Sequence, residues 1–299
     1  MKKKTLALVG LGNISPKLSP VIKNNNYCEL IVVCDINEKS IGRQYYKNIP
    51  FHKDYHDLLE YYPDYVYVAT DPASHYEIAS FFLAQGISVL CEKPPTVSFD
   101  EFKALNALAE RMGVGYHVIY HFRYSNEILW LKDHMQTFGE LRFASARYDD
   151  PYCDGSHIIE GRQYLMGAWM DSASNILSAW SYLFPRLSPE NLAYTIERDE
   201  KFHLPIRVVA SFEWNRIPFS IRISWKNNTR NKELIFVFEK GVVYIDLPNQ
   251  EIYFNGERKL SNNYSQSTMA HYNNFFNDMA GFLKDKQNDA VTKVLYSVQ

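Results

Sequence analysis

A short apolar stretch that ends in a glycine turn constrains this chain more than any other feature. Residues 5–9 are apolar or β-branched, Gly10 and Gly12 follow at once, and Pro16 opens a segment with apolar residues at helical spacing. This order predicts a strand, a tight turn and a helix start, where a dinucleotide pyrophosphate can lie against the helix N-terminus. Ser15 stands where a third Gly or Ala is expected, so a turn that binds nothing is the alternative.

Composition and charge exclude several classes of protein. The 299 residues are enough for two domains, and 32 basic against 34 acidic residues leave no positive excess for nucleic acid or an anionic membrane surface. No apolar run is long enough to span a membrane, and residues 1–9 are too short for a signal peptide. The four cysteines lack CxxC spacing. We therefore expect a cytoplasmic protein with reduced core cysteines and no metal site.

Strand and helix patterns alternate through the first 121 residues. Strands are expected at 29–34, 64–69, 87–91 and 114–119, and helices at 54–61, 76–85 and 98–112. This alternation predicts an α/β domain with a parallel sheet. We place this domain at residues 1–121 and a second domain at 122–299. Alternating patterns in the second domain predict antiparallel strands at 207–214, 219–225, 233–239, 242–247 and 250–255.

An acidic residue stands directly after the second expected strand. Asp35 lies somewhat more than twenty positions past the glycines, where a carboxylate can accept the ribose hydroxyls of a dinucleotide. The same charge would repel a 2′-phosphate, and no Arg is immediately next to it. The position therefore favours NAD over NADP. The alternative interpretation is that Asp35 caps a helix that starts at Asn37.

Two further strand ends carry polar residues at the edge of the sheet where ligands bind. Thr70, Asp71 and His75 follow one strand, and Glu92-Lys93-Pro94-Pro95 follows the next. A partly desolvated Lys93 could donate a hydrogen bond to a substrate hydroxyl. A solvent-exposed lysine that opens a loop is the alternative.

The glycine turn, Asp35, the Thr70-Asp71-Pro72 segment and above all Glu92-Lys93-Pro94 resemble the glucose–fructose oxidoreductase, inositol dehydrogenase and MocA family. The resemblance implies an α/β Rossmann domain followed by an α+β domain with a large, mostly antiparallel open sheet. It also implies hydride exchange between NAD(P) and a sugar or cyclitol carbon. The cofactor-binding residues that it implies are Gly10, Gly12, Asn13, Ile14, Asp35, Ile36, Thr70, Asp71, His75, Glu92, Lys93 and His121.

Three segments look most like the aldose 1-dehydrogenases of this family that act on D-galactose and L-arabinose. They are the doubled proline at 94–95, the sequence at 120–124 and the sequence at 167–178. In most of the family the last segment carries an Asp and a His four positions apart, but this chain has Asp171 and Asn175. The subgroup also has Asn there. The resemblance therefore implies that Asp171 removes the anomeric proton while Lys93 and Asn175 orient the hydroxyl.

We therefore expect an NAD-dependent enzyme that oxidises C1 of a galactose-, arabinose- or fucose-type aldopyranose to a lactone, and a homodimer or homotetramer formed through the second-domain sheet. Another sugar or cyclitol dehydrogenase remains an alternative, as does a non-catalytic sensor that binds NAD(H) and sugar.

A helix is expected at 168–184 and a polar loop at 149–155 over the substrate. The alternative to a catalytic role is that Asp171 interacts favourably with the helix dipole and that Asn175 is merely exposed to solvent. His271, Tyr272 and Phe275 are expected in the core, near a C-terminus that is shorter than is usual in the family.

Overall fold

The computed structural model describes residues 3–264, 267–283 and 289–298 and divides into two compact units. The first unit comprises Met1–His121 and Gln266–Gln287, and the second comprises Phe122–Ser265 and Asn288–Gln299. A domain that runs without interruption over 122–299 is therefore not what the structure shows. The segment after residue 265 returns to the first unit because its helix packs against α1 (Ser15–Asn24).

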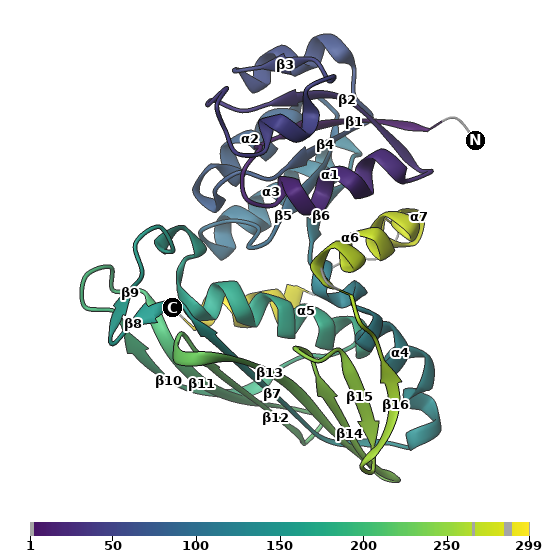
Figure 1. Ribbon diagram of the computed structural model, residues 1–299, viewed down its shortest axis with the longest axis vertical. Coiled ribbons are helices and arrows are strands. Elements are labelled where there is room, and N and C mark those ends of the chain that lie inside the picture. The colour runs from purple at the N-terminus through teal and green to yellow at the C-terminus, as the bar shows by residue number, and fades with distance from the viewer. Residues whose placement is uncertain (1–2, 265–266, 284–288, 299) are drawn as a thin grey trace. The chain divides into compact units, whose positions relative to one another are not determined.

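A six-stranded parallel sheet forms the centre of the first unit (Figure 1). Its strand order is β3-β2-β1-β4-β5-β6. The strands are β1 (Lys4–Val9), β2 (Cys28–Cys34), β3 (Phe51–His52), β4 (Tyr65–Val68), β5 (Ser88–Glu92) and β6 (Tyr116–Ile119). The centres of β1, β4 and β5 are fully buried, as expected for parallel strands that are covered on both faces. All four cysteines of the chain are buried.

The helices of the first unit begin and end at recognisable signals. They are α1, α2 (Pro72–Ala84), α3 (Phe99–Met112), α6 (Ser267–Asn277), α7 (Met279–Phe282) and the 3₁₀ helices η1 (Arg43–Tyr46) and η2 (Tyr55–Tyr61). Ser98 caps α3, and Gly113 ends it with a φ of +68°. Helix α2 begins at Pro72 rather than at the expected residue 76, because Asp71 caps it and proline suits a first turn.

An eight-stranded sheet forms the second unit, in the order β10-β11-β12-β7-β13-β14-β15-β16. Only the β12–β7 pair is parallel, so the expected mostly antiparallel sheet is confirmed. The strands are β7 (Leu141–Pro151), β10 (Glu190–Arg198), β11 (Pro205–Trp214), β12 (Ile217–Ser224), β13 (Lys226–Phe238), β14 (Gly241–Asp246), β15 (Glu251–Phe254) and β16 (Glu257–Ser261).

The expected loop at 149–155 is wrong in its first half. Asp149 and Asp150 belong to β7, because β12 and β13 pair with this strand almost to its end. The chain then forms a two-stranded hairpin of β8 (Cys153–Asp154) and β9 (His157–Ile158). Strand pairing therefore fixes the positions of these acidic residues.

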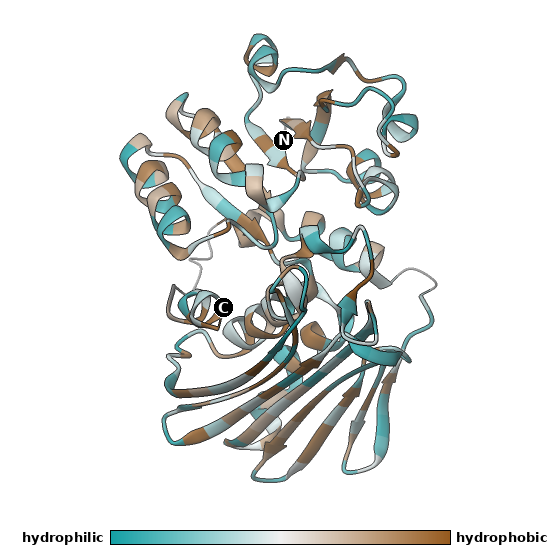
Figure 2. Ribbon diagram, turned by 90° about the vertical axis from the view of Figure 1, so that its left-hand side faces the viewer, coloured by the Kyte–Doolittle hydropathy of each residue, from teal (hydrophilic) through white to brown (hydrophobic). Residues whose placement is uncertain are grey.

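Helices cover one face of the large sheet, and α5 (Ser174–Leu183) lies across it (Figure 1). The other helical segments are η3 (His121–Tyr124), α4 (Asn126–His134), η4 (Met135–Phe138), η5 (Gln163–Leu165), η6 (Trp169–Ala173) and α8 (Asp289–Ser297). Trp180 of α5 packs edge-on against Phe219, at 4.9 Å between ring centroids. Apolar residues line many of the strands and alternate with polar ones (Figure 2), which is typical of a sheet with one buried face.

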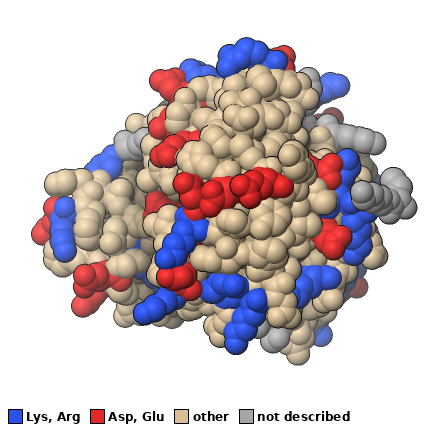
Figure 3. Space-filling view, turned by 90° about the horizontal axis from the view of Figure 1, so that it is seen from above, with Lys and Arg blue, Asp and Glu red and all other residues tan. Residues whose placement is uncertain are grey.

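Charge is mixed over the surface. Basic and acidic side chains are interspersed on the face shown in Figure 3, so that face offers no broad positive area to a polyanion. None of the helices in the described part of the chain is long and apolar enough to cross a membrane.

Candidate functional site

The turn after β1 has the two glycine environments that a pyrophosphate site requires. Gly10 has a φ of +96°, and a Cβ there would lie 2.6 Å from the carbonyl carbon and oxygen of Ala69. A Cβ at Gly12 would meet nothing within 4 Å. Gly10 is therefore needed by the fold, whereas Gly12 leaves open space in which a ligand can approach the backbone.

Helix α1 begins beside this turn without a side-chain cap. Its N-cap residue is Ile14, which makes no capping hydrogen bond, and Pro16 stands in the first turn. The N-cap side chain therefore does not neutralise the positive end of the helix dipole, and this end of the helix suits an anionic group. Asn13 is exposed and Ile14 is half-buried beside it. These residues fit the pyrophosphate of NAD.

The unexpected serine in the turn packs against Gly42. Ser15 is fully buried, and a Cβ at Gly42 would lie 2.3 Å from its Oγ and 2.3 Å from the carbonyl oxygen of Leu11. The Gly42 N–H also donates to that Leu11 carbonyl at 2.8 Å. Close packing therefore depends on a glycine at 42 instead of a third glycine in the turn. The glycine motif in the sequence does not indicate that Gly42 takes the place of its third glycine.

Asp35 holds the glycine turn in place. Its Oδ2 accepts the Leu11 N–H at 2.7 Å and its Oδ1 accepts the Asn37 N–H at 2.8 Å. No helix begins at Asn37, and the next helical segment is η1, so the helix-cap interpretation is wrong. Both contacts fix the carboxylate at the end of β2. Ile36, which is 88% exposed, stands next to it.

The residues after β4 are organised by short contacts. Asp71 Oδ1 accepts the Ala73 N–H, and the Ser74 hydroxyl donates to Thr70 Oγ1 at 2.8 Å. His75 is fully buried, with its ring nitrogens 3.0 Å from the Pro94 carbonyl oxygen and 3.1 Å from that of Thr70. Burial lowers the pKa of His75, although the carbonyls oppose this effect. Its contacts link the turn after β4 to the turn after β5.

Lys93 occupies a distinctive position in the turn after β5. It is half-buried, whereas its neighbours from residue 91 to residue 96 are all buried. The Pro94 carbonyl faces His75, and the Pro95 carbonyl accepts the hydroxyl of Tyr116 at 3.2 Å. The backbone around Lys93 is therefore held from α2 and from β6. This setting argues against a freely exposed lysine that opens a loop.

Glu92 points into the core of the first unit. Its Oε1 accepts the hydroxyls of Tyr67 at 2.7 Å and of Tyr272 at 2.6 Å, and its Oε2 faces the Lys93 N–H at 3.3 Å. Burial raises the pKa of Glu92, while the two hydroxyls and the charge of Lys93 lower it. The side chain is 9% exposed. This carboxylate therefore shapes the Lys93 turn from the inside.

A pair of histidines lies close to Tyr272. Nδ1 of His121 is 3.3 Å from Nδ1 of His271, and the His121 ring lies 5.1 Å from that of Tyr272. Burial, with a smaller effect from Lys17, lowers the pKa of His271 to about 4. His271, Tyr272 and Phe275 are buried, so their expected place in the core is confirmed.

In the second unit, Asp171 and Asn175 share the open face of one helical segment. Both are half-buried, whereas the other residues from 169 to 180 are buried. The expected single α-helix is wrong at its start, because η6 is a turn of π-helix that leads into α5. Asn175 Nδ2 donates to the Asp171 carbonyl at 3.3 Å, and the buried Asn175 Oδ1 accepts no hydrogen bond from the described residues. Single π-helical turns are frequent at functional sites.

A second carboxylate, that of Asp150, lies close enough to Asp171 for the two charges to interact. Asp150 is 2% exposed, and its Oδ2 is 2.8 Å from Nζ of Lys232. Its Oδ1 accepts no hydrogen bond within the described part of the chain and lies 4.0 Å from Nε of Arg230. Burial raises the pKa of Asp150, the two cations oppose the rise, and the charge of Asp171 adds to it. Sequence reasoning placed Asp150 in a loop and missed this ion pair.

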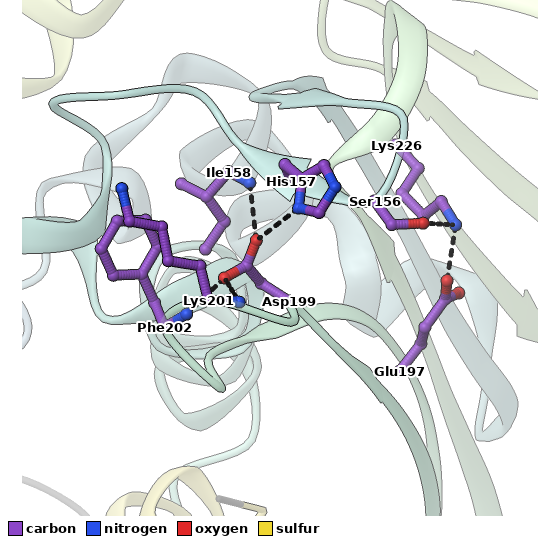
Figure 4. Close-up of polar contacts among 8 residues, drawn as sticks. All are labelled: Ser156, His157, Ile158, Glu197, Asp199, Lys201, Phe202 and Lys226. Atoms are coloured by element: carbon purple, nitrogen blue, oxygen red, sulfur yellow. Dashed lines mark hydrogen bonds and ion pairs between the residues drawn. The ribbon is translucent and has the colours of Figure 1, made fainter.

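The hairpin after β7 is anchored by an acidic residue at the end of β10 (Figure 4). Asp199 Oδ2 accepts the Ile158 N–H at 2.9 Å, and Oδ1 accepts the Lys201 and Phe202 N–H groups. Lys226 joins the neighbouring Ser156 to Glu197. These contacts fix the hairpin that follows Asp150.

The structure brings the expected residues together within each unit. Lys93, Thr70 and His75 share one end of the parallel sheet, Asp35 holds the glycine turn, and Asp171 and Asn175 share one helical face. Tyr67 and Tyr272 were missed as partners of Glu92, since no local pattern links them. Among the described residues there is no group of three or more His, Cys, Asp or Glu that could hold a metal ion.

Comparison with known proteins agrees with these features. The sequence profile described as "Oxidoreductase family, NAD-binding Rossmann fold" matches residues 4–120. The D-glucoside 3-dehydrogenase of Escherichia coli (strain K12) is 26% identical over 148 residues, which are 48% of this chain and 42% of that protein. The glucose-6-phosphate 3-dehydrogenase of Bacillus subtilis (strain 168) is 27% identical over 136 residues, 43% of this chain and 37% of that protein. The matches thus span about two fifths of these relatives.

A solved structure shows the same fold over the whole chain. The structure of GenD2 from gentamicin A biosynthesis, in complex with NAD, has a TM-score of 0.80 and 17% identity and covers 99% of this chain and 92% of that one. The two curated relatives named above are a D-glucoside 3-dehydrogenase and a glucose-6-phosphate 3-dehydrogenase, so neither supports the galactose and arabinose subgroup. The glycine turn and the Asp35 contacts both lie within residues 4–120, the part of the chain that is similar to the Gfo/Idh/MocA oxidoreductase family with its NAD-binding Rossmann fold.

Proposed function

We propose that this chain is an NAD-dependent dehydrogenase that oxidises a secondary hydroxyl of a pyranose sugar, with C3 of a hexose or hexoside as its first candidate position. The observation that carries the proposal is the family match over residues 4–120 together with the restrained Lys93 turn at the ligand edge of the same sheet. The names of the two curated relatives favour oxidation at C3.

The proposed cofactor site uses residues of the first unit. The open space at Gly12 and the uncapped start of α1 fit the pyrophosphate of NAD, and Asp35 is placed to accept a ribose hydroxyl. The exposed Ile36 offers an apolar surface next to that carboxylate. A carboxylate at this point favours NAD over NADP, because it would repel a 2′-phosphate.

The proposed chemistry needs one proton acceptor and one hydrogen-bond donor. Bound NAD accepts the hydride from the carbinol carbon. Asp171 accepts the proton of the reacting hydroxyl, since Asn175 cannot take a proton in the way that a histidine could. The Lys93 ammonium donates to the same oxygen and stabilises the negative charge that develops there. The partial exposure of Asp171 and of Lys93, each among buried neighbours, supports these roles.

Oxidation of C1 to a lactone is the second candidate. It is favoured by Asn175, which stands where the aldose 1-dehydrogenases of the family also have Asn. The same Asp171 would then remove an anomeric proton. The carbon that loses the hydride separates the two candidates, since C3 gives a ketone and C1 gives a lactone.

We also propose that the chain self-associates through its large sheet. Large apolar side chains are partly exposed on three of its strands: Tyr194 on β10, Val209 on β11 and Val242 on β14 are 45%, 44% and 40% exposed. Burial of such side chains between copies would be favourable. Sedimentation velocity of the wild type and of Val209→Glu tests this, and a monomeric wild type would contradict it.

The proposed reaction is tested with D-glucose, D-glucose 6-phosphate, methyl glucosides, D-galactose and L-arabinose, each with NAD and with NADP. Absorbance of the reduced cofactor reports turnover, and NMR of the product distinguishes a 3-keto sugar from a lactone. We expect NAD-dependent turnover of at least one sugar with a 3-keto product. Tight binding of NADH in calorimetry without turnover on any sugar would instead support the non-catalytic sensor.

A further inference from the structure

Glu92 is a buried carboxylate that the proposed chemistry does not use. It stands at the end of β5, and its three hydrogen-bond donors come from separate parts of the first unit. Tyr67 of β4 and Tyr272 of α6 donate to Oε1, and the backbone N–H of Lys93 faces Oε2 at 3.3 Å. Both tyrosines are fully buried.

The hydrogen bonds of this arrangement favour the ionised carboxylate and oppose burial, which raises the pKa of Glu92. A buried carboxylate is costly unless hydrogen-bond donors or an opposite charge compensate it. The two hydroxyls and the Lys93 charge supply both kinds of compensation. The other titratable groups around this cluster include Cys91, which adjoins Glu92, and Tyr46, which lies near Tyr67. The paired His121 and His271 lie beside Tyr272. The charge of Lys93 lowers the pKa of Glu92, so the two side chains attract each other.

We propose that Glu92 is a positioning residue for Lys93, and that the hydroxyls of Tyr67 and Tyr272 hold it in the charged form and orientation that this role requires. The inference rests on the proposed function, in which Lys93 acts on the substrate hydroxyl. After Lys93, the Pro94 and Pro95 carbonyls of the turn contact His75 and Tyr116. Before Lys93, Glu92 faces the Lys93 N–H. The backbone at Lys93 is therefore restrained on both sides, and the freedom that remains is that of the lysine side chain.

The C-terminal part of the chain contributes to the site around Glu92 through Tyr272. Helix α6 packs against α1 and brings Tyr272 to Glu92 across 180 positions of sequence. A segment remote in the sequence thereby completes the surroundings of Lys93.

The first test measures Lys93 itself and does not need turnover. The protein is treated with an excess of an amine-acylating reagent, and the labelling rate of each lysine is followed by mass spectrometry. In Glu92→Gln, which keeps the side-chain shape but not the charge, we expect Lys93 to be labelled several-fold faster, because the carboxylate no longer attracts and restrains its side chain. Lys103, paired with Asp100 at 2.7 Å on the surface, should keep its rate. An unchanged Lys93 rate would overturn the proposal.

The second test uses the pH dependence of turnover in Tyr67→Phe/Tyr272→Phe. Because both hydroxyls lower the pKa of Glu92, their loss raises it, so we expect the acid limb of kcat/KM to move to higher pH. Tyr46→Phe removes a buried hydroxyl that makes no hydrogen bond to a described residue, and it should leave the profile in place. Lower stability with an unmoved profile would show that the tyrosines are only structural. A wild type without turnover would contradict the proposed function alone, and the labelling rates would still decide the role of Glu92.

Discussion

The hydroxyl of Tyr272 donates a hydrogen bond of 2.6 Å to Oε1 of Glu92, and the two residues are 180 positions apart in the sequence. The bond ties α6 to the carboxyl end of β5, which is the sheet edge where Lys93 stands. Both residues are buried, so water cannot replace the hydroxyl if it is lost.

We expect Tyr272→Phe to lower the free energy of unfolding by about 1–3 kcal/mol, because a buried carboxylate loses one of its donors. Urea unfolding followed by circular dichroism measures the change. Tyr46→Phe is the matched control, since the Tyr46 hydroxyl is also buried but has no hydrogen-bond partner among the described residues. Equal losses in the two variants would show that the bond to Glu92 adds nothing.

The pH dependence of stability should report on Glu92. Burial raises its pKa above the ordinary value of 4.5 in the folded protein, so the folded state binds this proton more tightly than the unfolded state does. The contribution of Glu92 to the free energy of unfolding therefore falls as pH rises from 4.5 through the folded-state pKa. Glu92→Gln should remove that decline, and the exposed Glu60→Gln should not. Parallel stability curves for wild type and Glu92→Gln would contradict this.

The Asp150–Lys232 pair should behave as a coupled unit. Lys232→Met leaves Asp150 buried without its nearest cation, and we expect a loss of about 1–3 kcal/mol in the free energy of unfolding. Adding Asp150→Asn should recover much of this loss, because no unpaired charge remains. A double-mutant cycle in urea measures the coupling. Additive losses would mean that the two side chains do not interact.

The two glycines near the start of α1 should respond differently to a methyl group. In Gly42→Ala the new Cβ would meet the Leu11 carbonyl and Ser15, so we expect a loss of about 1–3 kcal/mol in stability. Gly12→Ala meets nothing in the protein and should change stability by less than about 1 kcal/mol, but it should weaken NAD binding about tenfold or more by blocking the pyrophosphate. Calorimetry with NAD measures the affinity, and an unchanged affinity in Gly12→Ala would place the cofactor elsewhere.

Local signals made much of the first unit predictable. The apolar strands, the glycine turn and Asp35 were identified because each depends on neighbouring residues or on a fixed spacing. The start of α2 was missed although Asp71 and Pro72 form a cap and a first turn, so better use of a local rule would have found it. The second-unit strands were placed to within a few residues over β11, β12, β14 and β15.

Other features depend on contacts between distant residues and could not be predicted. Tyr67 and Tyr272 meet at Glu92 only after the sheet and α6 have formed. Asp149 and Asp150 look like loop residues, but pairing with β12 and β13 makes them part of β7. No residue pattern distinguished the π-helical turn at Asp171 from an α-helical one. Tertiary packing decided each of these cases.

The central claim is that Asp171 accepts a proton during NAD-dependent oxidation of a sugar, and turnover of Asp171→Asn tests it most directly. The substitution keeps the shape of the side chain but removes the proton acceptor. We expect kcat to fall by about 10²–10⁴ with unchanged affinity for NAD, while Asp154→Asn, at an exposed position in β8, retains wild-type turnover. An Asp171→Asn protein that oxidises the sugar within about twofold of the wild-type rate would contradict the account.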